Sequence, residues 1–259
     1  MNYFDANTWI GRWPFAFLAA HTAGSLAGHL ARQGIGRALV SPLDAVFAPE
    51  PGPANRALLR AVRNSGKLEP VPVINPALAN WREELAACAS DPRVRAVRVL
   101  PRYHHYRLGA PAVGGLVREL GRLRLRLIVQ IRLIDERHEF HAMNLKPVPA
   151  GELGTFLRNH PALPVLAGGL LRRELLSLAP KHPRLIADLS WAEWHDTVPH
   201  LLESVPARQL AFATHTPFLV TAAGRAKLDT AAIPFSKRTA IAGANLEQFL
   251  SHETKSDRR

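Results

Sequence analysis

The stretch Phe4-Asp5-Ala6-Asn7-Thr8-Trp9-Ile10-Gly11 has the pattern of a short apolar strand that ends at a glycine turn. Asp5, Asn7 and Trp9 recur at every second position, so a regular strand would place their side chains on one face. A carboxylate, an amide and an indole on one face of the first strand predict a pocket with polar and aromatic walls.

Seven further β-like runs follow, and segments with apolar residues at helical spacing separate them. The expected strands cover residues 3–9, 37–41, 69–74, 94–100, 126–130, 164–167, 185–189 and 209–214. The expected helices cover residues 25–33, 54–65, 81–89, 112–123, 152–159, 172–178, 198–203, 219–228 and 237–250. This alternation indicates parallel strands with right-handed crossovers. Eight such units in about 250 residues predict an α/β fold, the (β/α)8 TIM barrel.

The chain reads as a single domain, because no Pro/Gly-rich or charged linker divides it. We expect residues 1–251 to form the barrel and residues 252–259 to be a charged C-terminal tail. No apolar run reaches the roughly 18–20 residues of a membrane helix, and no signal-peptide pattern is present. The single Cys88 excludes an intramolecular disulfide and favours a reducing compartment. We therefore expect a cytoplasmic protein with no membrane partner.

The formal charge of +12, from 33 Lys and Arg against 21 Asp and Glu, raises the question of nucleic-acid binding. The basic residues are spread through the chain, with no long Lys/Arg block and no RNA-binding motif. We expect no specific nucleic-acid partner, and an anionic small molecule explains the positive balance better. The sequence leaves a homo-oligomer open.

The residues at the ends of the predicted strands would converge on one pocket of the barrel. The candidate substrate-binding residues are Asp5, Asn7, Trp9, Arg12, Asn75, Arg98, Tyr103, His104, Gln130, Glu136, Arg137 and Asp188. His215, after the last strand, would be a general base or acid near neutral pH. Arg132, together with Arg12 and Arg98, would bind a carboxylate or stabilise an oxyanion. Asp135 or Glu136 would orient His215 or pair with those arginines.

Four motifs resemble the amidohydrolase-related branch of the amidohydrolase superfamily, a group of TIM-barrel metal-dependent hydrolases. They are F-D-A-N-T-W-I-G at 4–11, A-V-R-V-L-P-R-Y-H-H-Y at 96–106, F-A-T-H-T-P at 212–217 and A-I-A-G-A-N-L-E-Q-F-L at 240–250. The similarity extends over essentially the whole chain. In particular, the chain resembles a subgroup with G-R-W-P-F in the first loop and Q-x-R-x-x-D-E-R after a middle strand.

The resemblance implies a metal held by a His-x-His pair, one or two later histidines and an aspartate of the last strand. At these positions the chain has Asn7 and Trp9, then Gln130 and Ala167, and finally His215. Tryptophan does not ligate metals and neutral amides are poor zinc ligands. We therefore expect a degenerate metal site, no metal ligands and no conventional divalent-metal cofactor.

Three functional hypotheses remain open. In the first, the chain hydrolyses an ester, lactone or amide bond of a small anionic carboxylate without a conventional metal site. In the second, it is a non-catalytic pseudo-enzyme that binds a ligand or partner. In the third, it is a conventional metal-dependent hydrolase whose ligands the alignment of motifs misses.

Overall fold

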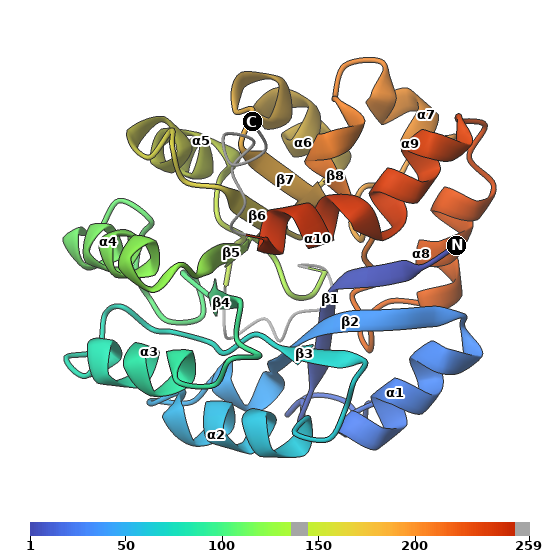
Figure 1. The fold of residues 1–259 in the computed structure, drawn as a ribbon. Coiled ribbons are helices and arrows are strands. Elements are labelled where there is room, and N and C mark those ends of the chain that lie inside the picture. Colours follow the sequence, from blue (N-terminus) through green and yellow to red (C-terminus); the bar gives the residue numbers. More distant parts are fainter. Residues whose placement is uncertain (136–144, 252–259) are drawn as a thin grey trace, which may run out of the picture.

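The computed structural model describes residues 1–135 and 145–251, which form a barrel of parallel strands surrounded by helices (Figure 1). The strands are β1 (Tyr3–Ile10), β2 (Ile35–Pro42), β3 (Leu68–Pro70), β4 (Ala96–Val99), β5 (Arg126–Gln130), β6 (Val165–Gly168), β7 (Leu185–Asp188) and β8 (Leu210–Ala211). The predicted strand β3 is shorter than expected, because Pro70 and Pro72 lack the N–H that a ladder requires.

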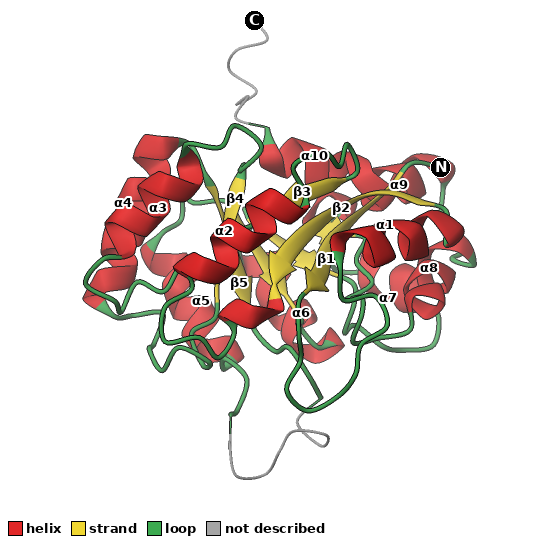
Figure 2. Cartoon of the chain, turned by 90° about the horizontal axis from the view of Figure 1, so that it is seen from below, coloured by secondary structure: helices red, strands yellow, loops and turns green. Residues whose placement is uncertain are grey.

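Helices follow the strands and cover the outside of the barrel (Figure 2). They are α1 (Ala23–Arg32), α2 (Gly52–Ala61), α3 (Trp81–Ala89), α4 (Pro111–Leu123), α5 (Ala150–Asn159), α6 (Arg172–Leu178), α7 (Thr197–Leu202), α8 (Thr221–Asp229), α9 (Phe235–Thr239) and α10 (Asn245–Leu250). The predicted last helix is a run of three parts, in which the π-helical turn Ala240–Ala244 joins α9 to α10. No helix in these two ranges is long and apolar enough to span a membrane.

The strands pair in sequence order, β1-β2-β3 in one sheet and β4-β5-β6-β7-β8 in another, and all pairs are parallel. Two single bridges close the barrel: Val73 pairs with Arg98, and Thr8 pairs with Thr216. The predicted (β/α)8 barrel is therefore confirmed.

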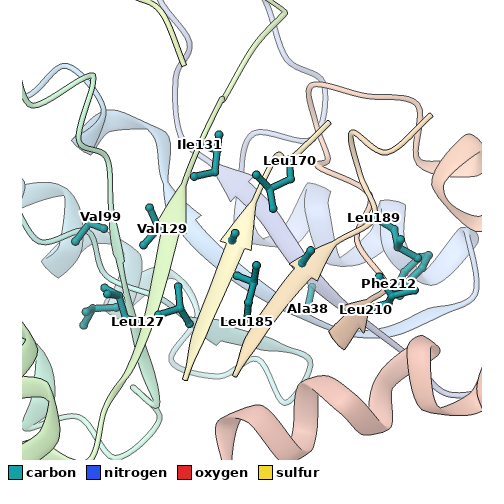
Figure 3. Packing of buried hydrophobic residues seen from close by; sticks show 14 of the residues in the cluster. Ala38, Val99, Leu127, Val129, Ile131, Leu170, Leu185, Leu189, Leu210 and Phe212 are labelled. Carbon is teal, nitrogen blue, oxygen red and sulfur yellow. The ribbon is translucent and has the colours of Figure 1, made fainter. Parts of the chain in front are cut away.

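Two apolar layers pack on the two faces of the strands. The inner layer includes Phe4, Ala6, Ile128 and Leu166, together with Phe249 of α10, which covers the end where the strands begin. The outer layer lies between strands and helices, and part of it is shown in Figure 3; it includes Ala38, Val99, Leu127, Val129, Leu185 and Phe212. Burial of an apolar side chain at each such position contributes roughly 1.5–3 kcal/mol, and this stabilises the packing of the helices on the barrel.

A register shift in β1 corrects the expectation that Asp5, Asn7 and Trp9 share one face. Asp5 pairs with Ala38 of β2, yet Thr8 pairs with Val40, so β1 contains one extra residue between these pairs. Such a bulge reverses the alternation of side chains. Asp5 lies between the inward-facing Phe4 and Ala6 and therefore points outward, whereas Asn7 and Trp9 point into the barrel.

Candidate functional site

Arg98 on β4 is the centre of a buried polar cluster inside the barrel. Its Nη1 donates to Oδ1 of Asn7 across 2.6 Å and to Oε1 of Gln130 across 2.8 Å. Nδ2 of Asn7 in turn donates to Oδ2 of Asp188 across 2.7 Å. The amide of Asn7 thus links the guanidinium to the carboxylate, and its orientation is fixed at both ends. All four side chains are buried.

The opposite edge of the Arg98 guanidinium makes no hydrogen bond within the described residues. Nε and Nη2 are buried and have no hydrogen-bond partner among the described residues. These two nitrogens form one edge of the planar group, the geometry that binds both oxygens of a carboxylate. Burial lowers the pKa of Arg98 to about 9, and the charges of Asp188 and Asp5 oppose that shift. The group therefore remains a cation at neutral pH.

Gly168 at the end of β6 makes room for this cluster. A Cβ at this position would lie 2.6 Å from Oε1 of Gln130 and 3.1 Å from Nδ2 of Asn7. The Gln130 amide is held from its other side, because Nε2 donates to the carbonyl oxygen of Arg132 across 2.7 Å. Both amides consequently turn their oxygens toward Arg98.

His215, in the loop after β8, is fully buried among aromatic rings. Its ring centroid lies 6.4 Å from Trp9, 5.8 Å from Trp191 and 5.5 Å from Phe218. The Trp9 ring also lies 4.3 Å from the guanidinium carbon of Arg98, so it neighbours both the histidine and the cation. The indole nitrogens of Trp9 and Trp191 have no acceptor within the described parts of the chain.

Nε2 of His215 lies 2.6 Å from the carbonyl oxygen of Leu133. Nδ1 is buried without a partner in the described residues. Burial lowers the pKa of His215 to about 4; the Leu133 contact and Asp188 oppose the shift, while Arg98 adds to it. The imidazole is therefore neutral at physiological pH.

The structure changes the roles expected for Arg132 and Asp135. Arg132 forms two bonds with Glu174 at the start of α6, of 2.8 and 3.0 Å, and a third with the carbonyl oxygen of Gly169. These contacts join β5 to β6 and make Arg98, rather than Arg132, the better-placed cation. The carbonyl of Leu133 holds His215 in the manner expected of Asp135, which is half-buried near the end of β5.

Four other predicted residues have partners outside the polar cluster around Arg98. Arg12 is exposed and forms a 3.5 Å contact with Asp44. Oδ1 of Asn75 accepts from the backbone N–H of Ala77. Tyr103 packs against Phe47 at 5.5 Å between ring centroids, and Nε2 of His104 bonds the carbonyl oxygen of Ala45 across 3.0 Å. The predicted Glu136 and Arg137, and the predicted tail 252–259, lie outside the described residues.

Several residues of the candidate site had no clear signal in the sequence. The carbonyl of Leu133 acts through the backbone, which any residue type supplies. Trp191 and Phe218 follow strand ends by several residues, so only their place in the fold brings them to His215. Ser190, whose hydroxyl donates to Oδ1 of Asp188 across 2.7 Å, stands at a strand end and was identifiable by position alone.

A cavity of about 1000 Å³ lies outside the barrel, where residues 105–111 meet one side of α5 along its length. None of its lining residues belongs to the cluster around Arg98 and His215. Because the buried unpaired nitrogens of Arg98, Trp9 and His215 belong to one cluster in the barrel, that cluster is the candidate site.

No family model matches the chain, and no curated protein matches it either. Solved structures do match over 96% of the chain. A 5-carboxyvanillate decarboxylase from Sphingomonas paucimobilis is 13% identical, with a TM-score of 0.72 over 98% of its length. A protein assigned to the amidohydrolases from Staphylococcus aureus is 9% identical, with a TM-score of 0.73 over 99% of its length.

A third match is a protein assigned as a 2-pyrone-4,6-dicarboxylic acid hydrolase from Acinetobacter baumannii, with citric acid bound; it is 13% identical, with a TM-score of 0.66 over 99% of its length. The chain has the fold of these TIM-barrel proteins. The resemblance to the amidohydrolase superfamily is thereby confirmed at the level of the fold.

Two further similar structures, both decarboxylases at 14% and 9% identity, hold manganese. This finding overturns the expectation that the chain has no divalent-metal cofactor, since two proteins of this fold hold such a metal. The described donors nevertheless do not fit manganese as they are placed. Oxygens of Asn7 and Gln130 accept from Arg98, and no group of three His, Cys, Asp or Glu side chains suited to a metal occurs in the described ranges.

Proposed function

We propose that the chain is an enzyme that hydrolyses an ester, lactone or amide bond in a small anionic carboxylate held inside the barrel. The contact of His215 Nε2 with the Leu133 carbonyl oxygen is the observation that carries this proposal. Nε2 faces the carbonyl oxygen of Leu133, which can only accept, so Nε2 carries the hydrogen. The neutral ring then keeps its lone pair on the unpaired Nδ1, which is the form a general base requires.

Arg98 is the proposed binding residue for the carboxylate. Its Nε and Nη2 match a two-pronged contact with both carboxylate oxygens, and such charge-assisted pairs are roughly twice as strong as neutral hydrogen bonds. Asn7 and Gln130 hold the guanidinium by Nη1 and keep the opposite edge in place. A pre-positioned cation reduces the ordering cost of binding.

In the proposed reaction, a water molecule gives a proton to Nδ1 of His215 while its oxygen bonds to the acyl carbon. The tetrahedral intermediate then expels the alcohol or amine, which takes the proton back from Nδ1. The indole N–H groups of Trp9 and Trp191, whose rings lie around His215, supply donors for the oxyanion.

A non-catalytic binding protein is the second candidate, and complete burial of the site favours it. Asn7, Arg98 and His215 have no exposed surface, so a ligand enters only when neighbouring side chains move. A barrel that binds one ligand for long periods needs such movement less often than an enzyme does.

The test is an assay of small carboxylates that carry an ester, lactone or amide, each with added manganese and with a chelator. CO2 release is measured in parallel, because similar structures include decarboxylases. The expected result is hydrolysis that His215→Gln lowers by about 10²–10⁴-fold. Ligand-dependent rises in Tm without turnover would support the second candidate, and CO2 release without hydrolysis would replace the proposed reaction.

A further inference from the structure

A continuous row of hydrogen bonds connects buried Asp5 with His29 on the outer helix α1. Asp5 Oδ2 accepts from the hydroxyl of Thr214. The hydroxyl oxygens of Thr214 and Thr216 are 2.6 Å apart, and those of Thr216 and Thr221 are 2.7 Å apart. Nε2 of His29 lies 2.7 Å from the Thr221 hydroxyl. Every link is within the range of an O–H···O or N–H···O bond.

The row runs from the barrel wall to the outer helices. Asp5 and the three threonines are buried, whereas His29 is half-buried in the groove where α1 meets α8. The outward turn of Asp5 at the β1 bulge is what directs its carboxylate to Thr214 rather than to Arg98. Oδ1 of Asp5 accepts the backbone N–H groups of Asn7 and Thr214, each at 3.0 Å, so Oδ2 is the oxygen that faces the row.

We propose that Thr214, Thr216 and Thr221 form a proton relay between Asp5 and the imidazole of His29, and through His29 with solvent. Each hydroxyl can accept one hydrogen bond and donate another, which is the property that a relay requires. Histidine is the side chain suited to exchange a proton with water near neutral pH. The relay does not depend on the reaction proposed above.

The transfer balances atom by atom. A doubly protonated His29 gives its Nε2 proton to the oxygen of Thr221, and each hydroxyl passes its own proton to the next. Thr214 delivers the last proton to Oδ2 of Asp5. The products are a neutral carboxylic acid and a neutral imidazole that carries hydrogen on Nδ1. The row then points the other way, with Asp5 donating to Thr214 and Thr221 donating to Nε2 of His29.

The hydrogen bonds of the row can all donate toward Asp5 or all donate toward His29, and the charge of Asp5 selects between these two arrangements. A carboxylate at Asp5 accepts from Thr214, so each hydroxyl donates toward Asp5 and His29 donates from Nε2. A protonated Asp5 donates to Thr214, so every bond reverses and Nε2 of His29 accepts from Thr221. The tautomer of the outer imidazole therefore reports the state of the inner carboxyl.

The charges around both ends are compatible with this exchange. Burial raises the pKa of Asp5 to about 7, bonds from Thr214 and Asn7 oppose the shift, and the charge of Asp188 on β7 adds to it. Arg98 on β4 also interacts with the Asp5 charge. Near the other end, α8 presents Arg225, whose guanidinium bonds the carbonyl oxygen of Gln33 at the end of α1.

Imidazole nitrogen NMR shifts of His29 test the relay at about pH 8.5, above the reference imidazole pKa of about 6.5. His29→Gln assigns the signals. In the unaltered protein, whose Asp5 is ionised at this pH, we expect the Nε2–H tautomer. Asp5→Asn places an amide donor against Thr214, so His29 should shift to the Nδ1–H tautomer. An Nδ1–H ring in the unaltered protein, a measurement that needs no folded variant, would overturn the proposal.

Thr216→Val removes the middle hydroxyl and tests the route. In that background, Asp5→Asn should no longer change the His29 tautomer. The matched control is Thr8→Val, which removes the hydroxyl of a buried threonine that bonds the carbonyl oxygen of Leu39 outside the row. There the shift caused by Asp5→Asn should persist. If Asp5→Asn still changes the His29 tautomer in the Thr216→Val background, Asp5 and His29 are coupled by another path and the proposed relay is wrong.

Discussion

The imidazole Nε2 of His215 lies 2.6 Å from the carbonyl oxygen of Leu133, and this contact joins the loop after β8 to the loop after β5. His215 has a φ of 57°, a left-handed conformation that is uncommon outside glycine. Strained residues of this kind persist where their surroundings hold them and often cluster at functional sites. The Leu133 carbonyl is one such restraint.

His215→Gln and His215→Phe should separate the restraint from the proposed chemistry. Glutamine keeps an N–H donor for the Leu133 carbonyl, whereas phenylalanine leaves that buried oxygen unpaired, at a cost of about 1–3 kcal/mol. Both variants should lose turnover, but only His215→Phe should lower the free energy of unfolding by that amount in urea melts. Equal stability of the two variants would mean that the contact restrains nothing.

Arg98→Lys tests the binding of the substrate carboxylate. Lysine keeps the charge but loses the planar pair of donors at Nε and Nη2, so KM should rise at least about tenfold, more than kcat falls. Arg102→Lys is the matched control, because Arg102 follows the same strand and pairs with Glu152 instead. An unchanged KM in Arg98→Lys would remove Arg98 from the binding site.

Gly168→Ala should disturb the same cluster without altering any charge. The added Cβ would lie 2.6 Å from Oε1 of Gln130, a distance that forces the amide to move and Arg98 with it. We expect at least about a tenfold loss of kcat/KM. Gly121→Ala in α4 is the control, since nothing lies within 4 Å of its Cβ position. That change should stabilise the chain by up to about 1 kcal/mol.

Arg132 and Glu174 should act as one structural unit. Removing one partner leaves the other charge poorly compensated in a largely buried place, so Arg132→Ala should cost about 3–5 kcal/mol of unfolding free energy. The double variant Arg132→Ala/Glu174→Ala should lose less unfolding free energy than the sum of the losses of the two single variants. Additive losses in this double-mutant cycle would contradict a direct pair.

The barrel was readable from the sequence because strand and helix periods alternate eight times. The residues that point into the barrel could be predicted only in part. Arg98, Gln130 and Asp188 stand at regular strand ends, and their prediction as neighbours is consistent with the hydrogen bonds of the cluster. The one-residue bulge that turns Asp5 outward depends on the register with β2, which no local pattern encodes.

Partners that are remote in sequence limited the prediction of the polar contacts. Thr214 and Thr216 flank His215 within F-A-T-H-T-P, but their partner Thr221 lies on α8 and His29 on α1. The engagement of Arg132 by Glu174 likewise depends on the packing of α6 against β5 and β6. Such contacts follow from the tertiary arrangement and are not visible in the sequence. The prediction of Arg132 as the catalytic cation therefore rested on its side-chain chemistry alone.

The pH dependence of stability should contain two opposing contributions. The pKa of Asp5 is raised to about 7 in the folded protein, so its contribution is full below its unfolded pKa of about 4 and is lost as pH rises through 7. The pKa of His215 is lowered to about 4, so its contribution is full above about 6.5 and is lost as pH falls through 4.

Tm measured between about pH 4 and pH 7 should therefore resolve the two groups through their variants. Asp5→Asn removes a contribution that weakens with rising pH, so the Tm of this variant relative to the unaltered protein should increase across the range. His215→Gln removes a contribution that strengthens with rising pH, so its relative Tm should decrease. Parallel Tm curves for both variants and the unaltered protein would mean that neither buried group titrates differently on folding.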